Sequence, residues 1–448
     1  MDKGLLKTIA ASMIGSVLEW YDYTIYGTAS ALVFGTLFFP KLSGVVGTLL
    51  SLATFAIGFL ARPIGGIIFG TLGDKVGRKK VLMLTIIIMG SSTTLIGVVP
   101  TYNSIGYWAP LLLVLLRILQ GIGSGSEYAG AVILMAENSP TKHRGFMSSL
   151  PYLGVSLGLM LSSGVYSLCK MLPNAEFVSW GWRIPFLLSV LIVLFGLLIR
   201  MGLSETPIFE QISSRHERVR HPLRTAFRMS PKGIILAWMV ATQDNSFTYL
   251  FQTFITAYVE NQLHLPDSVM LTTLTLMGLI QLVAVPAFGA LSDKIGRRPI
   301  LITGALLSAL YGFPFFWMLN TKSPILIGVS VILASSIFRG AIVAVQASWY
   351  TELFSSKIRY TGFAVGREWP SALGGVVPVF ASAVLIWSHG HTWAISILII
   401  VFSLLTVVAG ILGPENSKLE LTDINGDLTR ASLNETTINA MEEPGTSR

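Results

Sequence analysis

The sequence predicts an all-α membrane protein with twelve transmembrane helices in two pseudo-symmetric six-helix bundles, and three observations support this fold class. Of the 448 residues, 52% are hydrophobic and only 12% are charged, whereas a soluble domain carries roughly 25% charged residues. Apolar runs of about 20 residues, the length that crosses the hydrocarbon core of a bilayer, recur along most of the chain. A short basic loop motif also occurs twice, once in each half. These observations exclude a soluble protein.

The twelve apolar runs are each expected to form one transmembrane helix. Several exceed the length of a single span and are expected to tilt. The first run carries Glu19 and Asp22 and lacks a small-residue cleavage site, so it is expected to be a retained helix rather than a secretory signal. The runs are 9–37, 46–70, 80–99, 106–135, 146–169, 182–202, 232–256, 269–291, 298–318, 323–350, 358–386 and 391–413.

The positions of lysine and arginine predict the orientation in the membrane. These residues gather in alternate loops, as they do in cytoplasmic loops. The loops are 75–80, 142–144, 215–232, 294–298 and 357–359. Both termini are therefore predicted to be cytoplasmic, in a multi-pass protein of the bacterial inner (plasma) membrane. This placement explains the net charge of +8 by topology, so no nucleic-acid partner is expected.

Polar segments divide the chain into four parts. The one long polar insertion between apolar runs begins at Ser204 and separates six runs from six. The predicted parts are an N-terminal bundle 1–203, a cytoplasmic linker 204–231, a C-terminal bundle 232–413 and a disordered cytoplasmic tail 414–448. The single cysteine, Cys169, excludes an intrachain disulfide, and no metal-ligand cluster is present in the sequence.

The repeated loop reads GTLGDKVGRK from Gly70 and GALSDKIGRR from Gly289, and its matched residues keep one constant spacing along the chain. A second pair of motifs, after the fourth and tenth runs, recurs at nearly the same spacing. Glycines allow unusual backbone dihedrals, and an aspartate can cap a helix or pair with an arginine. A plain positive-inside turn would explain the charges but not this recurrence. We therefore predict a conformational gate formed by Gly70, Asp74, Gly77, Arg78, Glu137, Arg144, Asp293, Gly296, Arg297, Glu352 and Arg359.

At these motifs the chain resembles the major facilitator superfamily, whose signature loop is G-x-L-x-D-x-x-G-R-[RK]. Over about residues 5 to 415 it is similar to the metabolite:proton symporter branch, and in particular to its shikimate-transporter-like group. The resemblance implies two bundles that rock about a central site, and proton-driven uptake of a small solute by a monomer with the proton as coupling ion and no other cofactor. The segments that carry it are EWYDY (19–23), ATFAIGFLARPIGG (53–66), RILQGIGSGSEYAGA (117–131), SWGWRIPF (179–186), SETPIFE (204–210) and RYTGFA (359–364).

Charged side chains within the first and fourth runs are candidates for proton coupling, because ionisable groups at bilayer depth are costly and commonly functional. Glu19 and Asp22 share one helix face with Tyr26, and Arg117 shares another with Glu127. Gly121, Gly123 and Gly125 are expected to let the first helix approach the fourth. Since arginine stays charged while a carboxylate can take a proton, we predict that Asp22 pairs with Arg117. The resemblance to proton-coupled sugar carriers also implies this role for Asp22. The alternative is a static ion pair, and for Glu127 the two interpretations weigh equally.

Arginines at other membrane positions are candidates for binding the solute, because a guanidinium suits a carboxylate. Arg62 either binds the substrate or braces the adjacent loop. Arg339 and Arg367 either anchor the substrate or are neutralised by Asp244 and Glu368. Neighbouring helical residues point about 100° apart, so one of Arg367 and Glu368 is expected to face the cavity and the other a helix. The predicted substrate-binding residues are Tyr23, Tyr26, Arg62, Gln120, Asp244, Arg339, Arg367 and Glu368.

No nucleotide-binding loop or catalytic arrangement is present, so an enzyme is not expected. The sequence favours proton symport that imports a small polar organic solute, with an organic acid such as shikimate or a di- or tricarboxylate preferred. Uptake of a zwitterion of the proline or betaine type, and proton-driven efflux, remain alternatives. Five acids against four arginines in the predicted membrane segments leave both a monoanion and a zwitterion open.

Overall fold

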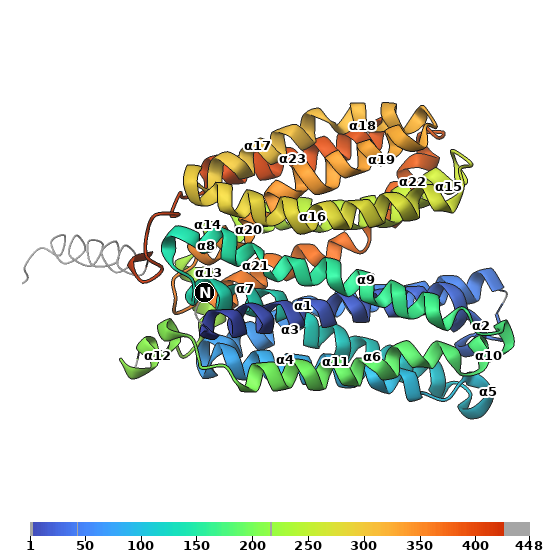
Figure 1. Cartoon of the computed structure of the whole chain (residues 1–448), viewed down its shortest axis with the longest axis horizontal. Coiled ribbons are helices and arrows are strands. Elements are labelled where there is room, and N and C mark those ends of the chain that lie inside the picture. The colour runs from blue at the N-terminus through green and yellow to red at the C-terminus, as the bar shows by residue number, and fades with distance from the viewer. Residues whose placement is uncertain (1–2, 43, 216, 425–448) are drawn as a thin grey trace, which may run out of the picture.

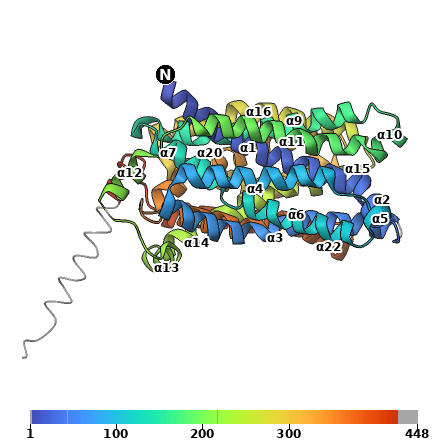
Figure 2. The ribbon, with the colours of Figure 1, turned by 90° about the horizontal axis from the view of Figure 1, so that it is seen from below.

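The computed structural model describes residues 3–42, 44–215 and 217–424, and every regular element within these ranges is a helix. The long helices run along the long axis of the molecule, with the first half of the chain on one side and the second half on the other (Figure 1). The repeated loops and the linker helices lie at one end (Figures 1 and 2). We call this end the basic end, because loops 75–80, 142–144, 294–298 and 357–359 lie there.

The long helices of the first half lie on the predicted apolar runs, and short helices connect them. Those of the first half are α1 (Lys3–Ala29), η1 (Ser30–Phe34), α2 (Gly35–Phe38), α3 (Gly44–Val76), α4 (Arg78–Val98), α5 (Tyr102–Ile105), α6 (Trp108–Ser124), α7 (Glu127–Glu137), η2 (Thr141–His143), α8 (Arg144–Ser149), α9 (Pro151–Cys169), α10 (Asn174–Ser179), η3 (Gly181–Arg183) and α11 (Ile184–Met201). The predicted linker contains two short helices, α12 (Pro207–Ser214) and α13 (Pro222–Met229).

The second half repeats this arrangement of long helices with short breaks. Its helices are α14 (Pro231–Tyr249), η4 (Leu250–Phe254), α15 (Ile255–Asn261), α16 (Asp267–Ile295), α17 (Arg297–Leu310), α18 (Gly312–Asn320), α19 (Pro324–Ile332), η5 (Leu333–Phe338), α20 (Arg339–Leu353), α21 (Arg359–Gly374), α22 (Val377–Trp387) and α23 (Trp393–Leu412). The segments η1, η4 and η5 are π-helical, a distortion that often marks functional sites.

All twelve predicted runs fall on helices, although not all pass a test of length and apolarity. Among the described residues eight helices are long and apolar enough to cross a membrane, and two bent pairs, α17 with α18 (48°) and α21 with α22 (40°), raise this number to ten. The first and seventh runs are not among them. Their helices α1 and α14 carry buried polar side chains, including Asp22 and Asp244, which lower their apolarity. The polar side chains that make these helices functional candidates thus also lower the mean hydropathy by which a membrane-spanning helix is recognised.

Small residues bring the fourth run close to its neighbours, but not to the helix that the sequence predicts. A side chain at Gly121 would overlap the carbonyl oxygen of Gly58 on α3, and one at Gly125 would overlap that of Arg62 on the same helix. Gly123 faces the backbone of Met89 on α4. The expectation that these glycines admit the first helix is therefore wrong, because they admit α3 and α4.

Candidate transport site

Each aspartate of the repeated loop reaches across to the opposite half and caps a helix there. Asp74, near the end of α3, accepts a hydrogen bond of 2.8 Å from the backbone N–H of Thr361 in the first turn of α21. Asp293, near the end of α16, accepts one of 2.7 Å from the backbone N–H of Gly145 in α8. A carboxylate at a helix N-terminus satisfies free N–H groups and complements the helix dipole. The two caps join the halves at the basic end.

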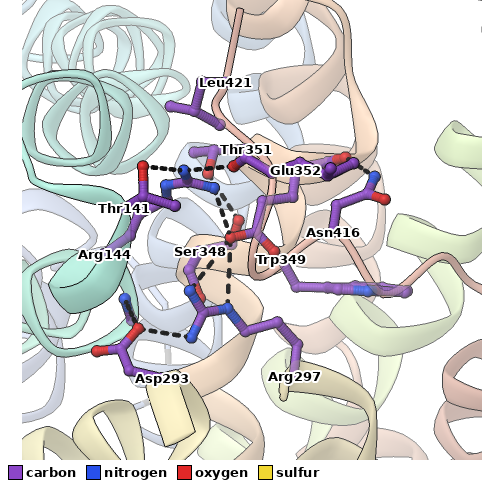
Figure 3. A network of polar contacts seen from close by, with 12 residues as sticks. Thr141, Arg144, Asp293, Arg297, Ser348, Trp349, Thr351, Glu352, Asn416 and Leu421 are labelled. Carbon is purple, nitrogen blue, oxygen red and sulfur yellow. Dashed lines mark hydrogen bonds and ion pairs between the residues drawn. The ribbon is translucent and has the colours of Figure 1, made fainter. Parts of the chain in front are cut away.

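Two buried glutamates bind crossed pairs of arginines beside these caps, and Figure 3 shows the cluster around Glu352 with Arg144 and Arg297. Each glutamate pairs with one arginine of its own half and one of the opposite half. The distances are 3.6 Å for Glu137–Arg78, 2.9 Å for Glu137–Arg359, 3.2 Å for Glu352–Arg297 and 3.0 Å for Glu352–Arg144. The predicted gate residues therefore lie together at the basic end, and their action as a gate stays a prediction.

Two further glutamates cap the helices that follow the repeated loops, and the sequence analysis gave them no role. Glu205 accepts a hydrogen bond of 3.0 Å from the backbone N–H of Arg78, and Glu415 accepts one of 3.0 Å from that of Arg297. The preceding glycines, Gly77 and Gly296, have φ of 115° and 98°, a region that favours glycine. A usable signal was present, since both glutamates closely follow the last apolar run of their half.

Glu415 lies outside the membrane-spanning segments, and its environment favours the ionised form. Burial acts to raise the pKa of Glu415, but hydrogen bonds from Ser417 and from the backbone N–H groups of Arg297 and Arg298 outweigh burial and hold the pKa below its ordinary value. The cap is therefore charged at neutral pH, as a cap at a helix N-terminus should be.

The segment 414–424, which the sequence places in a disordered tail, packs against both halves at the basic end. Arg144 donates a hydrogen bond of 2.7 Å to the carbonyl of Leu419, and Arg359 donates one of 3.0 Å to that of Leu421. Leu421 and Ile424 are buried against Ala136. Polar composition misled the prediction here, because backbone carbonyls rather than side chains make most of the contacts. The remainder of the predicted tail, 425–448, lies outside the described residues.

In the first half, Asp22 is buried among hydroxyl groups rather than against an arginine. It accepts hydrogen bonds of 2.6 Å from Thr93 and 3.1 Å from Ser189. Gln120 donates to the same Thr93 hydroxyl at 2.6 Å and accepts from Arg117. The predicted direct pair is therefore wrong for this conformation: no ion pair joins Asp22 to Arg117 in the described chain. A chain of hydrogen bonds through Thr93 and Gln120 connects them.

Arg117 is fully buried and surrounded by aromatic rings. Its guanidinium lies 4.4 Å from the ring centre of Tyr26, 4.8 Å from Tyr23 and 4.9 Å from Phe55. Aromatic faces attract a cation, and the attraction grows as water is excluded. Tyr23 and Tyr26, predicted to contact the substrate, therefore help to hold Arg117 where a carboxylate was expected.

Glu127, predicted as a coupling candidate, forms an ion pair with Arg200 of α11. It also accepts a hydrogen bond of 2.7 Å from Thr85. The prediction overlooked Arg200 because it lies near the end of an apolar run, although the structure buries it. With Arg200 included, the buried helices of the transport region hold as many arginines as acids. The paired geometry of Glu127 suits a structural role, and its part in coupling stays a prediction.

A line of four charged side chains crosses between the two halves at mid-depth. Arg62 of α3 lies 2.8 Å from Glu19 of α1 and 2.6 Å from Glu368 of α21. Glu368 also pairs with Arg367 at 2.8 Å. As expected, Arg367 faces a cavity while Glu368 faces a helix partner, yet the two side chains also bind each other. Arg62 joins the halves and does not brace the loop.

The second half contains a direct ion pair at positions that correspond to Asp22 and Arg117. Asp244 and Arg339 lie 2.7 Å apart. The spacing from Asp22 to Asp244 along the chain is identical to the spacing from Arg117 to Arg339. This common spacing, close to those of the loop motifs, marks the two acid–arginine sets as products of one duplication. Sequence analysis named all four residues but did not relate them.

A small enclosed cavity lies between the halves beside this ion pair. It measures about 10 Å³, room for about one water molecule. Three predicted binding residues, Asp244, Arg339 and Arg367, line it, whereas Tyr23, Tyr26, Arg62, Gln120 and Glu368 do not. The other lining residues, which are outside the predicted binding set, are Trp20, Tyr128, Tyr152, Val155, Asn245, Thr248, Tyr249 and Gln346.

Four of the lining residues have buried polar atoms without a hydrogen-bond partner in the described chain. These atoms are the Tyr128 hydroxyl, the Gln346 Oε1, the Arg367 Nε and the Asp244 Oδ1, and of these only Asp244 Oδ1 is ion-paired, with Arg339. Buried polar groups are normally paired, so the Tyr128, Gln346 and Arg367 atoms leave hydrogen-bonding capacity unused beside the cavity. Gln346 follows Arg339 by two turns of the same helix, and this spacing was the signal that could have identified it.

Comparison of the sequence with known protein families identifies the family of the chain. The model of the Major Facilitator Superfamily matches residues 5–367. The chain belongs to the major facilitator superfamily. Its fold agrees, since the proton:xylose symporter XylE bound to 6-bromo-6-deoxy-D-glucose superimposes with a TM-score of 0.77 at 17% identity, covering 94% of this chain and 98% of that one. The twelve-helix arrangement of two bundles is therefore confirmed.

Curated relatives of this superfamily are also similar over most of their length. The Shikimate transporter of Escherichia coli K12 is 38% identical over 418 residues, which are 92% of this chain and 95% of the relative. The Proline/betaine transporter of Salmonella typhimurium LT2 is 35% identical over 395 residues, 85% of this chain and 78% of the relative. The chain is thus a multi-pass membrane transporter of the superfamily rather than an enzyme.

Proposed function

We propose that this transporter imports a small organic acid together with protons, by alternating access of the central site to the two sides of the membrane. The observation that carries the proposal is the environment of Asp22. This carboxyl group is buried among hydroxyls, which can donate or accept hydrogen bonds. It can therefore take and release a proton without leaving a partner unsatisfied.

The hydrogen-bond chain connects the protonation state of Asp22 to the rest of the bundle. Asp22 is linked through Thr93 and Gln120 to Arg117, which has only aromatic and neutral polar neighbours among the described residues. Loss of the proton places a negative charge near an unpaired cation, so the two attract each other. We infer that this attraction favours one arrangement of α1, α4 and α6 and couples protonation to conformation.

An anionic substrate is favoured by the polar atoms around the cavity. The free Nε of Arg367 can donate to a carboxylate, and its ring contact with Tyr128 at 4.3 Å fixes its plane. Gln346 Oε1 can accept from a substrate hydroxyl. A proton and a monoanion that enter together carry no net charge across the membrane. The similarity to a shikimate transporter supports the same class of substrate.

We also propose that the basic end faces the cytoplasm, as the positive-inside rule predicts, and that the transporter acts as a monomer. The alternative substrate is a zwitterion, which the similarity to a proline/betaine transporter supports. A zwitterion would place its cation near Asp244, and a betaine, which has no N–H or O–H group, would leave Gln346 Oε1 without a donor.

The test is an uptake screen with purified protein in proteoliposomes, using labelled hydroxylated acids, di- and tricarboxylates, proline and betaine. The proposal predicts accumulation of an acid only when the outside is acidic, with alkalinisation of the medium on adding that acid. Acid-driven loss of preloaded solute would instead indicate efflux. Accumulation that ignores the proton gradient would refute coupling.

A further inference from the structure

A groove at the basic end lies outside the transport site and is formed by the linker. Its volume is about 560 Å³. One wall is a single face of α3, and the other is the start of α13. The lining residues are Ile67, Ile68, Thr71, Leu72, Lys75, His221, Pro222, Leu223 and Arg224. The groove is therefore large enough for part of a lipid molecule and distinct from the cavity between the bundles.

The charged side chains that line the groove are all basic. Lys75, His221 and Arg224 are exposed, and no acid is among the lining residues. In the described chain no ion pair neutralises any of the three. A basic rim is suited to a phosphate group, which offers several acceptor oxygens.

The apolar part of the groove lies where acyl chains lie. Ile67 and Ile68 belong to the membrane-spanning part of α3, which runs from Leu49 to Val76, and Ile68 is 43% exposed. Lys75 is at the end of the same span, two turns further along. The basic residues thus lie at the depth of the lipid headgroups, and the isoleucines lie at the depth of the acyl chains. A phospholipid has its charged and apolar parts in the same sequence along the membrane normal.

The helix α13 has the form of a helix at a membrane surface. Pro222 and Ala226 are buried toward the protein, while Phe227 and Met229 are 44% and 45% exposed. Figure 2 shows α13 beside α14 at the basic end, outside the long helices. Exposed apolar side chains next to Arg224 and Arg228 are typical of an interfacial helix near anionic lipid.

We propose that this groove binds one anionic phospholipid of the leaflet that borders the basic end, with its phosphate on Lys75 and Arg224 and an acyl chain along Ile67 and Ile68. Basic pockets between transmembrane helices bind anionic headgroups in this way. Because α13 packs on α3 of the first half and on α14 and α21 of the second, the lipid bridges the halves beside the Asp74 cap. It stabilises the conformation that is closed at the basic end.

The test measures lipid retained by the full chain in native mass spectrometry, from micelles with equal amounts of phosphatidylglycerol and phosphatidylcholine. The wild type should retain phosphatidylglycerol in preference. K75Q/R224Q should lower this preference about fivefold for each charge removed, because each basic residue near the surface contributes about 1 kcal/mol. The control K142Q/R215Q removes two exposed positive charges from the same end but outside the groove, and should leave the preference unchanged.

Two further arms separate a lipid from a soluble anion. Ile68→Trp fills the apolar wall and keeps the charges, so it should reduce retention of the lipid. Millimolar glycerol phosphate should not displace the lipid. Equal preference in K75Q/R224Q and wild type, an equal drop in the control, full retention in Ile68→Trp, or displacement by glycerol phosphate would each overturn the proposal.

Discussion

The acid–arginine set of the first half and that of the second half derive from the same repeat but are connected differently. Asp244 and Arg339 form a direct ion pair of 2.7 Å. Their first-half counterparts, Asp22 and Arg117, are joined only through hydroxyl and amide groups. The position that corresponds to Gln120 is Ile342 in the second half, at the same spacing along the chain. Because isoleucine cannot form a hydrogen bond, Arg339 binds its acid directly, whereas Arg117 binds Gln120.

We infer from this difference that the two halves have different roles in transport. A carboxylate held against an arginine is best kept ionised, since arginine does not give up its proton. A carboxyl group among hydroxyls can take either form. We therefore assign proton coupling to the first half and substrate binding to the second, where Arg339 and Arg367 line the cavity. Duplication supplied the same residues to both halves, and a few neighbours gave them different partners.

The largest effect is expected from Asp244→Asn, which removes the partner of a buried arginine. Breaking a buried ion pair on one side costs about 3–5 kcal/mol, so the thermal unfolding temperature should fall strongly, and both accumulation and exchange of substrate should be lost. The double variant D244N/R339Q should recover part of the stability but no transport. An unchanged unfolding temperature in Asp244→Asn would show that the ion pair is not formed in the membrane.

A smaller effect is expected from Gln120→Leu, which makes the first half resemble the second. Without the amide, Arg117 is free to approach Asp22, and a hydrogen bond to a charged group is lost at a cost of about 1.5–3 kcal/mol. Gradient-driven accumulation should fall while exchange continues. Ile342→Leu, the corresponding position of the other half, is the matched control and should transport as the wild type does. Equal accumulation in both variants would contradict the claim that Gln120 distinguishes the first half from the second.

The comparison extends to the predicted gate residues at the basic end. The linker residue Glu205 caps the helix that follows the first repeated loop, whereas segment 414–424 packs against both halves and against Ala136, the residue before Glu137. Deleting 414–448 should raise maleimide labelling of Ala136→Cys in a Cys169→Ser background by about tenfold or more, since two or more hydrogen bonds of about 1 kcal/mol each are lost. Deleting only 425–448 is the control. Equal labelling of the two deletions would contradict a sealing role for the segment.

The smallest effect is expected at the glutamate caps. Loss of a helix cap costs about 1 kcal/mol, so Glu205→Gln and Glu415→Gln should lower stability slightly and by similar amounts. The pKa of Glu415 is lowered in the folded protein, so its contribution is present above the ordinary glutamate pKa and is lost as pH falls through the lowered value. Thermal unfolding of wild type and Glu415→Gln should therefore converge in acid. Glu420→Gln, at an exposed position of the same segment, is the control and should unfold at the temperature of the wild type.

The helices and the set of gate residues could be predicted from the sequence, because the length of an apolar run and a repeated motif are local signals. Sequence analysis did not predict the groups that Asp74 and Asp293 bind, since these are backbone N–H groups, which have no sequence signature. The pairing of Asp22 with Arg117 was predicted from their opposite charges, from the glycines expected to bring the first helix to the fourth, and from the resemblance to proton-coupled sugar carriers. The intervening Gln120 and Thr93 come from different helices, and their meeting depends on how α4 packs on α6. Arg200 was overlooked at the end of an apolar run, where position alone does not reveal burial.

The most direct test of the division between the halves is a side-by-side assay of Asp22→Asn in proteoliposomes. Accumulation driven by a pH gradient and exchange of labelled for unlabelled substrate are measured on the same preparation. The account predicts that Asp22→Asn retains exchange and loses gradient-driven accumulation, with an unfolding temperature near that of wild type because no ion pair is broken. Accumulation equal to wild type in this variant would contradict it.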